Sequence, residues 1–287
     1  MYRNMTPRHD PQPEKKQSKP AIVEDKDLFS GEHFDLTGEK DKQTEAADAQ
    51  MLALIQQVGW DITKPNTVAD AFRKIFHIMF VDAFGENGPF WHQIKKYHDM
   101  VEYEERNDVG GPAFHKGAVI TKAFVIREKG KPKANRPCLI EFHGGAAVAG
   151  TAEQGNAFCA RFAVECDVTI VNVDYRLAPE NKAPAGIHDA YAAVKWVIAN
   201  AKELGIDANR IAIMGESGGG YICGGVAIEL AKRGEGGLIR FQLQAIPMTS
   251  NAMLTKPDSD FEEWELGQGA TRLIATDIIR ALAPDFD

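Results

Sequence analysis

The sequence predicts an α/β fold built on a mainly parallel β-sheet. In the second half of the chain, short apolar runs alternate with longer segments of helical period, which is typical of strands joined by crossover helices. The run Val168–Val173 is β-branched and apolar almost throughout, as in a strand buried on both faces. With 287 residues, 44% of them hydrophobic and 26% charged, the chain is long enough for one large domain.

The first half of the chain is predicted to be helical after a charged beginning. Residues 1–43 hold few apolar side chains, so part of this segment is expected to be flexible or draped over the rest. Apolar residues then recur at helical spacing around 51–58 and from Thr67 to Ala83, and a polar helical run ends at Met100. Gly110-Gly111-Pro112 forms a natural joint between this part and the next.

After the joint, strands are predicted to alternate with helices. The first strand, Val119–Glu128, has the alternating pattern of an edge or antiparallel strand. The later strands are predicted at Cys138–Phe142, Val168–Val173, Arg210–Met214 and Phe241–Ile246, and the helices between them at about 154–166, at about 185–202 and directly after Ser217.

Composition excludes several classes of function. The net charge is −8, which argues against nucleic acid or an anionic membrane as the main partner. No stretch approaches the ~20 apolar residues of a membrane span, and no secretory signal precedes the charged N-terminus, so a cytoplasmic location is expected. The four cysteines are too sparse for a disulfide scaffold and lack zinc spacing; they are expected to be buried thiols, and no metal or cofactor is expected. These four are Cys138, Cys159, Cys166 and Cys223.

The strongest chemical signal is Gly215-Glu216-Ser217-Gly218-Gly219-Gly220, between a predicted strand and a predicted helix. In that context, G-x-S-x-G is typical of a sharp turn that presents a serine hydroxyl above the sheet. A phosphate-binding turn would instead have G-x-G-x-x-G or a following Gly-Lys-Ser/Thr, and neither is present. Ser217 is therefore the candidate nucleophile.

A second signal is His143-Gly144-Gly145-Ala146, about seventy residues upstream and directly after a predicted strand. A glycine pair there leaves backbone N–H groups free to stabilise an oxyanion, together with the N–H of Gly218. Alone, this motif would indicate an ordinary flexible loop; its order relative to Ser217 favours the oxyanion hole. The candidate hole comprises Gly144, Gly145, Ala146 and Gly218.

Four motifs in this order resemble the hormone-sensitive-lipase branch of the α/β-hydrolase esterases. They are His143–Ala146, Asp174-Tyr175-Arg176-Leu177-Ala178-Pro179-Glu180, Pro184-Ala185 with Asp189, and Gly215–Gly220. The resemblance covers about residues 115–250. It implies a carboxylic ester hydrolase with a serine nucleophile and a small ester substrate. It also implies that 44–110 is a helical cap region, that 111–287 is the hydrolase core, and that His143 and the 174–180 segment have structural roles.

The sequence departs from the family pattern at the catalytic base. A serine nucleophile needs an acid and then a histidine after it in the chain, yet none of the eight histidines follows Ser217. The triad acid and histidine are therefore not identifiable. Only 40 residues remain after Pro247, and they contain no convincing strand, so the core is expected to be incomplete at the C-terminus.

Three explanations for the absent base stay open. In the first explanation, the chain is a fragment that is completed by a missing C-terminal segment or by another chain. The possible partners include a second copy of the chain in a homo-oligomer. Alternatively it is a catalytically silent, small-molecule-binding homologue, as plant gibberellin receptors are by resemblance. In the third explanation, a histidine of the N-terminal half replaces the missing base, with His98 and His115 as the candidates.

Overall fold

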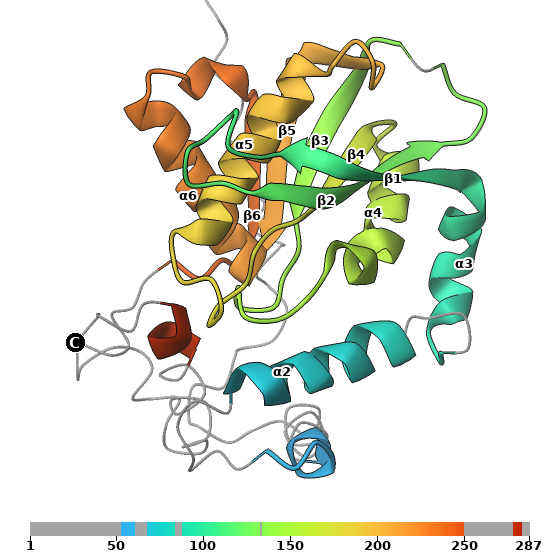
Figure 1. Cartoon of the computed structure of the whole chain (residues 1–287). Coiled ribbons are helices and arrows are strands. Elements are labelled where there is room, and N and C mark those ends of the chain that lie inside the picture. The colour runs from blue at the N-terminus through green and yellow to red at the C-terminus, as the bar shows by residue number, and fades with distance from the viewer. Residues whose placement is uncertain (1–52, 61–67, 84–87, 133, 250–277, 283–287) are drawn as a thin grey trace, which may run out of the picture. The chain divides into compact units, whose positions relative to one another are not determined.

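A computed structural model describes residues 53–60, 68–83, 88–132, 134–249 and 278–282 of the chain (Figure 1). The chain divides into two compact units, Met1–Asp48 and Ala49–Asp287, and every described residue belongs to the second. The N-terminal segment 1–43 therefore lies outside the described residues.

The described strands form one sheet of mixed direction in the order β1-β2-β4-β3-β5-β6. β2 pairs antiparallel with both β1 and β4, whereas β3, β4, β5 and β6 run parallel to one another. The mainly parallel sheet predicted from the sequence is thus confirmed. The strands are β1 (Val101–Gly110), β2 (Ile120–Glu128), β3 (Arg136–Phe142), β4 (Thr169–Asp174), β5 (Ile206–Glu216) and β6 (Phe241–Ala245).

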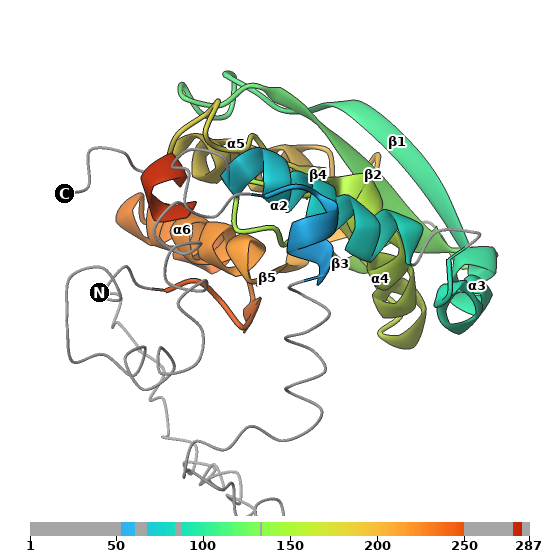
Figure 2. The same ribbon diagram turned by 90° about the horizontal axis from the view of Figure 1, so that it is seen from below.

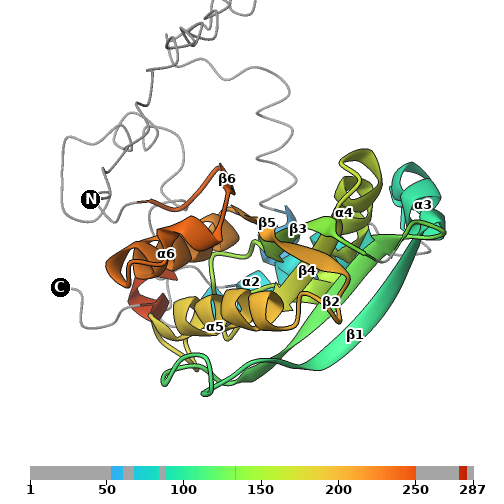
Figure 3. The same ribbon diagram turned by 90° about the horizontal axis from the view of Figure 1, so that it is seen from above.

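Helices cover both faces of this sheet (Figure 3). α5 (Ala185–Ala199) and α6 (Gly218–Lys232) pack on one face, where they share a core with the apolar side chains of β3, β4 and β5. α4 (Ala152–Glu165) packs on the opposite face against β2 and β4. The sheet is buried on both sides because each crossover between parallel strands brings a helix onto one face.

The first helical segments of the described chain, at 53–57 and 68–76, lie near the loops after β3 and β4 (Figure 2), whereas the helix at 91–100 packs against α4. A short helical segment at 53–57 ends at Gly59, whose φ of +67° suits a helix C-terminus. α2 (Val68–Phe76) continues into a π-helical stretch, η1 (His77–Asp82), and α3 (Trp91–Met100) leads into β1. Ile75 of α2 is buried against the loop that follows β3.

Strand β1 is not predicted by the sequence pattern. Its central residues are charged or polar and half-buried or exposed, since β1 lies at an edge of the described sheet and pairs with no described strand other than β2. A strand of this kind has no apolar run to reveal it. The buried state expected for all four cysteines is wrong for Cys166, which is exposed at the end of α4, while the other three are buried free thiols.

At the opposite edge, β6 pairs with β5 and with no other described strand. Its apolar side chains are open to solvent, with Phe241 60% exposed and the adjoining Ile246 83% exposed. None of the described helices has the length and apolar character that a bilayer crossing requires.

Candidate functional site

Ser217 sits at a strained turn between β5 and α6. Its φ of +49° and ψ of −114° lie outside the regions that side-chain-bearing residues ordinarily adopt. The turn is crowded, because a Cβ on Gly215 would collide with the carbonyl oxygen of Gly219. The Ser217 N–H donates to the carbonyl of Ala245 at 2.8 Å, which fixes the turn to the end of β6. This is the geometry that G-x-S-x-G predicts between a strand and a helix.

The loop after β3 brings further backbone N–H groups to Ser217. Gly145, Ala146 and Ala147 all have positive φ, at 113°, 55° and 56°. A Cβ on Gly218 would come within 2.5 Å of the Ala146 nitrogen, so this loop packs directly on the residue after the serine. Within the described part of the chain, the N–H groups of Gly145 and Ala146 donate no hydrogen bond. They are therefore free to bind an oxyanion.

The same loop is held from within by its own backbone. The carbonyl of Gly145 accepts from the N–H of Val148 at 3.0 Å and of Ala149 at 2.8 Å, and the carbonyl of Ala147 accepts from Ala178 at 3.0 Å. A side chain at Gly145 would collide with the Ala149 carbonyl oxygen. Ala147, which the sequence motif does not single out, also places its nitrogen against Gly218 and joins the candidate donors.

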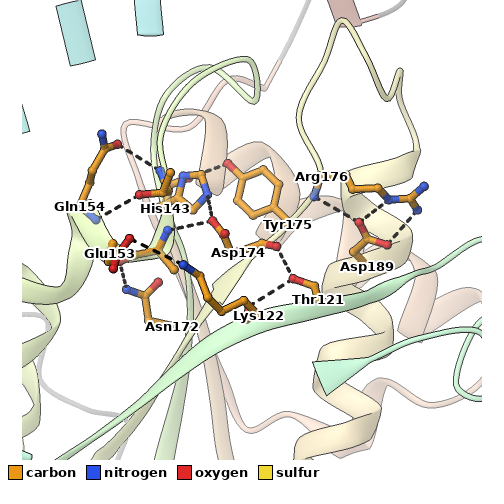
Figure 4. A network of polar contacts seen from close by, with 12 residues as sticks. Thr121, Lys122, His143, Glu153, Gln154, Asn172, Asp174, Tyr175, Arg176 and Asp189 are labelled. Carbon is orange, nitrogen blue, oxygen red and sulfur yellow. Dashed lines mark hydrogen bonds and ion pairs between the residues drawn. The ribbon is translucent and has the colours of Figure 1, made fainter. Parts of the chain in front are cut away.

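The side chain of His143 packs against Tyr175 and contacts the backbone of this loop (Figure 4). Its ring is buried and stacks on Tyr175 with centroids 4.4 Å apart, and its Nδ1 lies 2.8 Å from the Gly144 carbonyl oxygen. Burial lowers the pKa of His143. The hydrogen bond with the Gly144 carbonyl and the charge of Asp174 act in the opposite direction and raise this pKa; the Asp174 Oδ1 lies 3.8 Å from Nε2 of His143. The neutral ring with its proton on Nδ1 fits these contacts, so His143 positions the loop.

The 174–180 segment is anchored by two arginine–carboxylate pairs. Arg176 forms a bidentate pair with the fully buried Asp189, with nitrogen–oxygen distances of 2.7 and 2.8 Å (Figure 4). Asp189 also accepts from the backbone N–H of Val119 and of Arg176. Glu180 binds Arg73 of α2 in the same bidentate way, and Arg73 donates further to the carbonyls of Val148 and Ala178. The Arg73–Glu180 pair holds α2 against the 174–180 segment, and the bond to Val148 holds it against the loop after β3, beside Ser217.

A cavity of about 220 Å³ opens beside the loop that follows β3, with Gly144 and Gly150 in its wall. Its walls are mainly apolar and come from Phe76 of α2, Phe80 of η1, Ile94 of α3 and Phe158 of α4. Next to it lies a wider hollow of about 590 Å³, which shares four lining residues with the cavity and is also lined by Trp91, His98 and Tyr103. Apolar walls of this kind suit the hydrocarbon part of a small ligand.

Two carboxyl groups line the cavity and were not predicted as site residues. Glu141, the next-to-last residue of β3, is only 3% exposed, and burial together with the charge of Glu216 raises the pKa of Glu141 to about 8. Burial also raises the pKa of Glu216, the residue before the serine. The signal in the sequence was a carboxylate inside the otherwise apolar run Cys138–Phe142.

The structure brings neither candidate replacement base into contact with the serine. His98 Nδ1 lies 3.0 Å from the Tyr103 hydroxyl, while His115 contacts Arg233 and the ring of His188. Among the described residues, no histidine forms a hydrogen bond with the Ser217 hydroxyl. His9 and His33, and the acids Asp258, Asp260 and Asp277, lie outside the described residues.

Comparison with known proteins places this chain in a family. The family model described as the alpha/beta hydrolase fold matches residues 139–283, about half of the chain. The chain belongs to the alpha/beta hydrolase family. A sharp strand-to-helix turn around G-x-S-x-G above a parallel sheet is a structural feature of this fold, and the turn at Ser217 has this form.

Individual relatives are esterases by name. Esterase LipI of Mycobacterium tuberculosis is 42% identical over 117 residues, which are 41% of this chain and 36% of that protein. Carboxylesterase NlhH of the same species is 43% identical over 115 residues, covering 40% of this chain and 36% of that protein. The matched part thus spans about a third of the length of these relatives. A hyperthermophilic esterase from Pyrobaculum calidifontis shares the fold, with a TM-score of 0.57 and 24% identity over 83% of this chain and 74% of that one.

Proposed function

We propose that this protein hydrolyses carboxylic esters, with Ser217 as the nucleophile. The observation that carries the proposal is the placement of a strained serine against a loop whose Gly145 and Ala146 N–H groups have no partner within the described residues. The names of LipI and NlhH support the same class of reaction.

In the proposed reaction, the Ser217 Oγ attacks the ester carbonyl carbon and the carbonyl π electrons move onto oxygen. The N–H groups of Gly145, Ala146 and Gly218 stabilise that oxyanion; Gly144 shapes the loop, and Ala147 supplies a further candidate donor. Collapse of the intermediate breaks the bond to the alcohol, which leaves with a proton, and an acyl-enzyme remains. Water then adds to the acyl carbon and releases the carboxylic acid and the free serine.

The general base that receives the serine proton is not assigned to any described residue. The histidine of a serine hydrolase both removes this proton and returns one to the leaving alcohol. His143 is unsuited to that exchange, because it is buried, stacks on Tyr175 and uses Nδ1 to hold the Gly144 carbonyl. The cytoplasmic location, a homo-oligomeric state and a substrate of small size stay predictions alongside the reaction.

Labelling with a fluorophosphonate tests the nucleophile. We expect the native chain to take one phosphonyl group on Ser217 and Ser217→Ala to take none, whereas Ser250→Ala, which removes a different serine hydroxyl, labels as the parent does. A native, folded chain that takes no label, or that takes it at another residue, contradicts the proposal. The absence of any label would favour the alternative of a small-molecule-binding homologue without catalysis.

A further inference from the structure

The cavity beside the oxyanion loop has an acidic end. Glu141 and Glu216 both line it, at the ends of two neighbouring parallel strands, whereas the rest of the wall is mostly aromatic and aliphatic. Glu141 is 3% exposed, and its Oε2 is buried without a hydrogen-bond partner in the described part of the chain. Buried polar groups are normally paired, so an unpaired carboxylate oxygen in a cavity wall indicates an absent partner.

A second buried oxygen near Glu141 also lacks a donor. Asn172 lies opposite Glu141 in the pairing of β4 with β3, and its Oδ1 has no partner among the described residues. Its amide nitrogen is already used, donating to the Ala152 carbonyl at 2.6 Å and to Asn156 Oδ1 at 3.0 Å. Both unpaired oxygens lie within 4 Å of the point that a Cβ on Gly155 would occupy. The absence of a side chain at Gly155 leaves this point open.

Within the described residues, no cationic side chain is among the groups found to interact electrostatically with Glu141. The groups found to do so are themselves acids: Glu216 of β5, Cys159 of α4, Cys223 of α6 and Tyr175 after β4. Burial and Glu216 together leave the Glu141 carboxyl largely protonated at neutral pH, since its pKa is about 8. The described residues contain no group of three or more histidine, cysteine or acidic side chains that could hold a metal ion.

We propose that the acidic end of this cavity binds the ammonium group of an amine-bearing arm of the ester substrate, through Glu141 with Glu216 facing the same space. The substrate class rests on the proposed function, whereas the binding of the ammonium group does not. An ammonium group supplies three hydrogen-bond donors and one positive charge, which is the complement of unpaired acceptors beside two carboxyls. A hydroxyl supplies one donor and no charge. The apolar walls, including Phe76 and Phe80, accommodate the carbon chain that carries the amine.

Hexylamine and 1-hexanol form a matched pair of probes, because they share a six-carbon chain and differ in the terminal group. Calorimetric titration of the full 287-residue chain at pH 7.5 is expected to show hexylamine binding at least about 10-fold more tightly than hexanol, the scale of one charge-assisted hydrogen bond. Binding of the ammonium also displaces the Glu141 proton to the buffer. The hexylamine enthalpy is therefore expected to differ between phosphate and Tris buffers.

Glu141→Gln keeps the size of the side chain and removes its charge. In this variant we expect the preference for hexylamine over hexanol and the buffer dependence both to disappear, with hexanol affinity unchanged. The matched control is Glu153→Gln, which removes an exposed carboxylate from the neighbouring helix α4 and is expected to bind both probes as the parent does. Circular dichroism at pH 7.5 verifies that each variant is folded.

Three results would overturn the inference: equal binding of the two probes to the parent chain, no binding of either probe, or an unchanged amine preference in Glu141→Gln. Ser217→Ala separates the inference from the proposed function. It removes the nucleophile and is expected to bind hexylamine as the parent does. If Ser217→Ala loses the label and keeps its amine selectivity, both proposals are supported. If the parent chain cannot be labelled but binds hexylamine selectively, only the ammonium site is supported.

Discussion

Replacing Glu141 with glutamine is expected to change how stability depends on pH. The carboxyl has a pKa of about 8 in the folded chain, raised by burial and by Glu216, against an ordinary value of 4.5. The folded state therefore binds the proton more tightly, and Glu141 stabilises it most at low pH. Between the two pKa values, that stabilisation falls by about 1.4 kcal/mol for each pH unit, because the unfolded carboxyl is ionised and the folded one is not.

The assay is urea unfolding of the parent and of Glu141→Gln at pH 5.5 and at pH 7.5. The free energy of unfolding of the parent minus that of the variant is expected to fall by about 2 to 3 kcal/mol between these pH values. Because Glu216 is present in both proteins, its own titration largely cancels in the difference. A difference that stays constant with pH, or that rises with it, would refute the assignment of a raised pKa to Glu141.

Three further changes test the parts that surround the serine. Gly145→Val should slow fluorophosphonate labelling of Ser217 by about 10²-fold or more, since a side chain there collides with the Ala149 carbonyl. Gly236→Val is the control, because a side chain at Gly236 meets no neighbouring atom, and it should label at the parent rate. Equal labelling rates for the two variants would show that the loop after β3 does not form the oxyanion hole. Asp189→Ala should lower the free energy of unfolding by about 3 to 5 kcal/mol, because it leaves Arg176 without its buried partner. Urea unfolding measures this change, and a loss below 1 kcal/mol would contradict a stabilising role for the Arg176–Asp189 pair. Arg73→Ala should raise the pKa of Glu180 from about 2 toward 4.5, which NMR titration of the Glu180 carboxyl carbon measures. A pKa that stays near 2 would mean that Arg73 is not what lowers the pKa of this carboxylate.

Strands buried on both faces are predictable from the sequence because burial imposes an apolar composition. β3, β4 and the core of β5 fall where the apolar runs place them, and Ser217 lies in the turn that its glycines predict. Edge strand β1 is different. Its exposed face carries charged side chains, and its pairing with β2 depends on backbone hydrogen bonds that leave no trace in composition.

The acidic end of the cavity illustrates the same limit for the site. Glu141 is visible in the sequence as one carboxylate in an apolar strand, but its meaning depends on what lies across the sheet. Only the pairing of β3 with β4 and β5 places it beside Asn172 and near Glu216, and only the packing of α4 places Gly155 against it. These contacts join residues distant in the chain, and a local motif does not record them.

Trapping the acyl-enzyme tests directly whether Ser217 is the nucleophile. The chain is mixed with p-nitrophenyl butyrate, quenched in acid at early times and examined by intact-mass and peptide mass spectrometry. We predict that p-nitrophenol release is accompanied by one butyryl group per chain, attached to Ser217, and that Ser217→Ala acquires none. Release of p-nitrophenol from the native chain without an acyl group on Ser217, or with the acyl group on another residue, would contradict the assignment of Ser217 as the nucleophile.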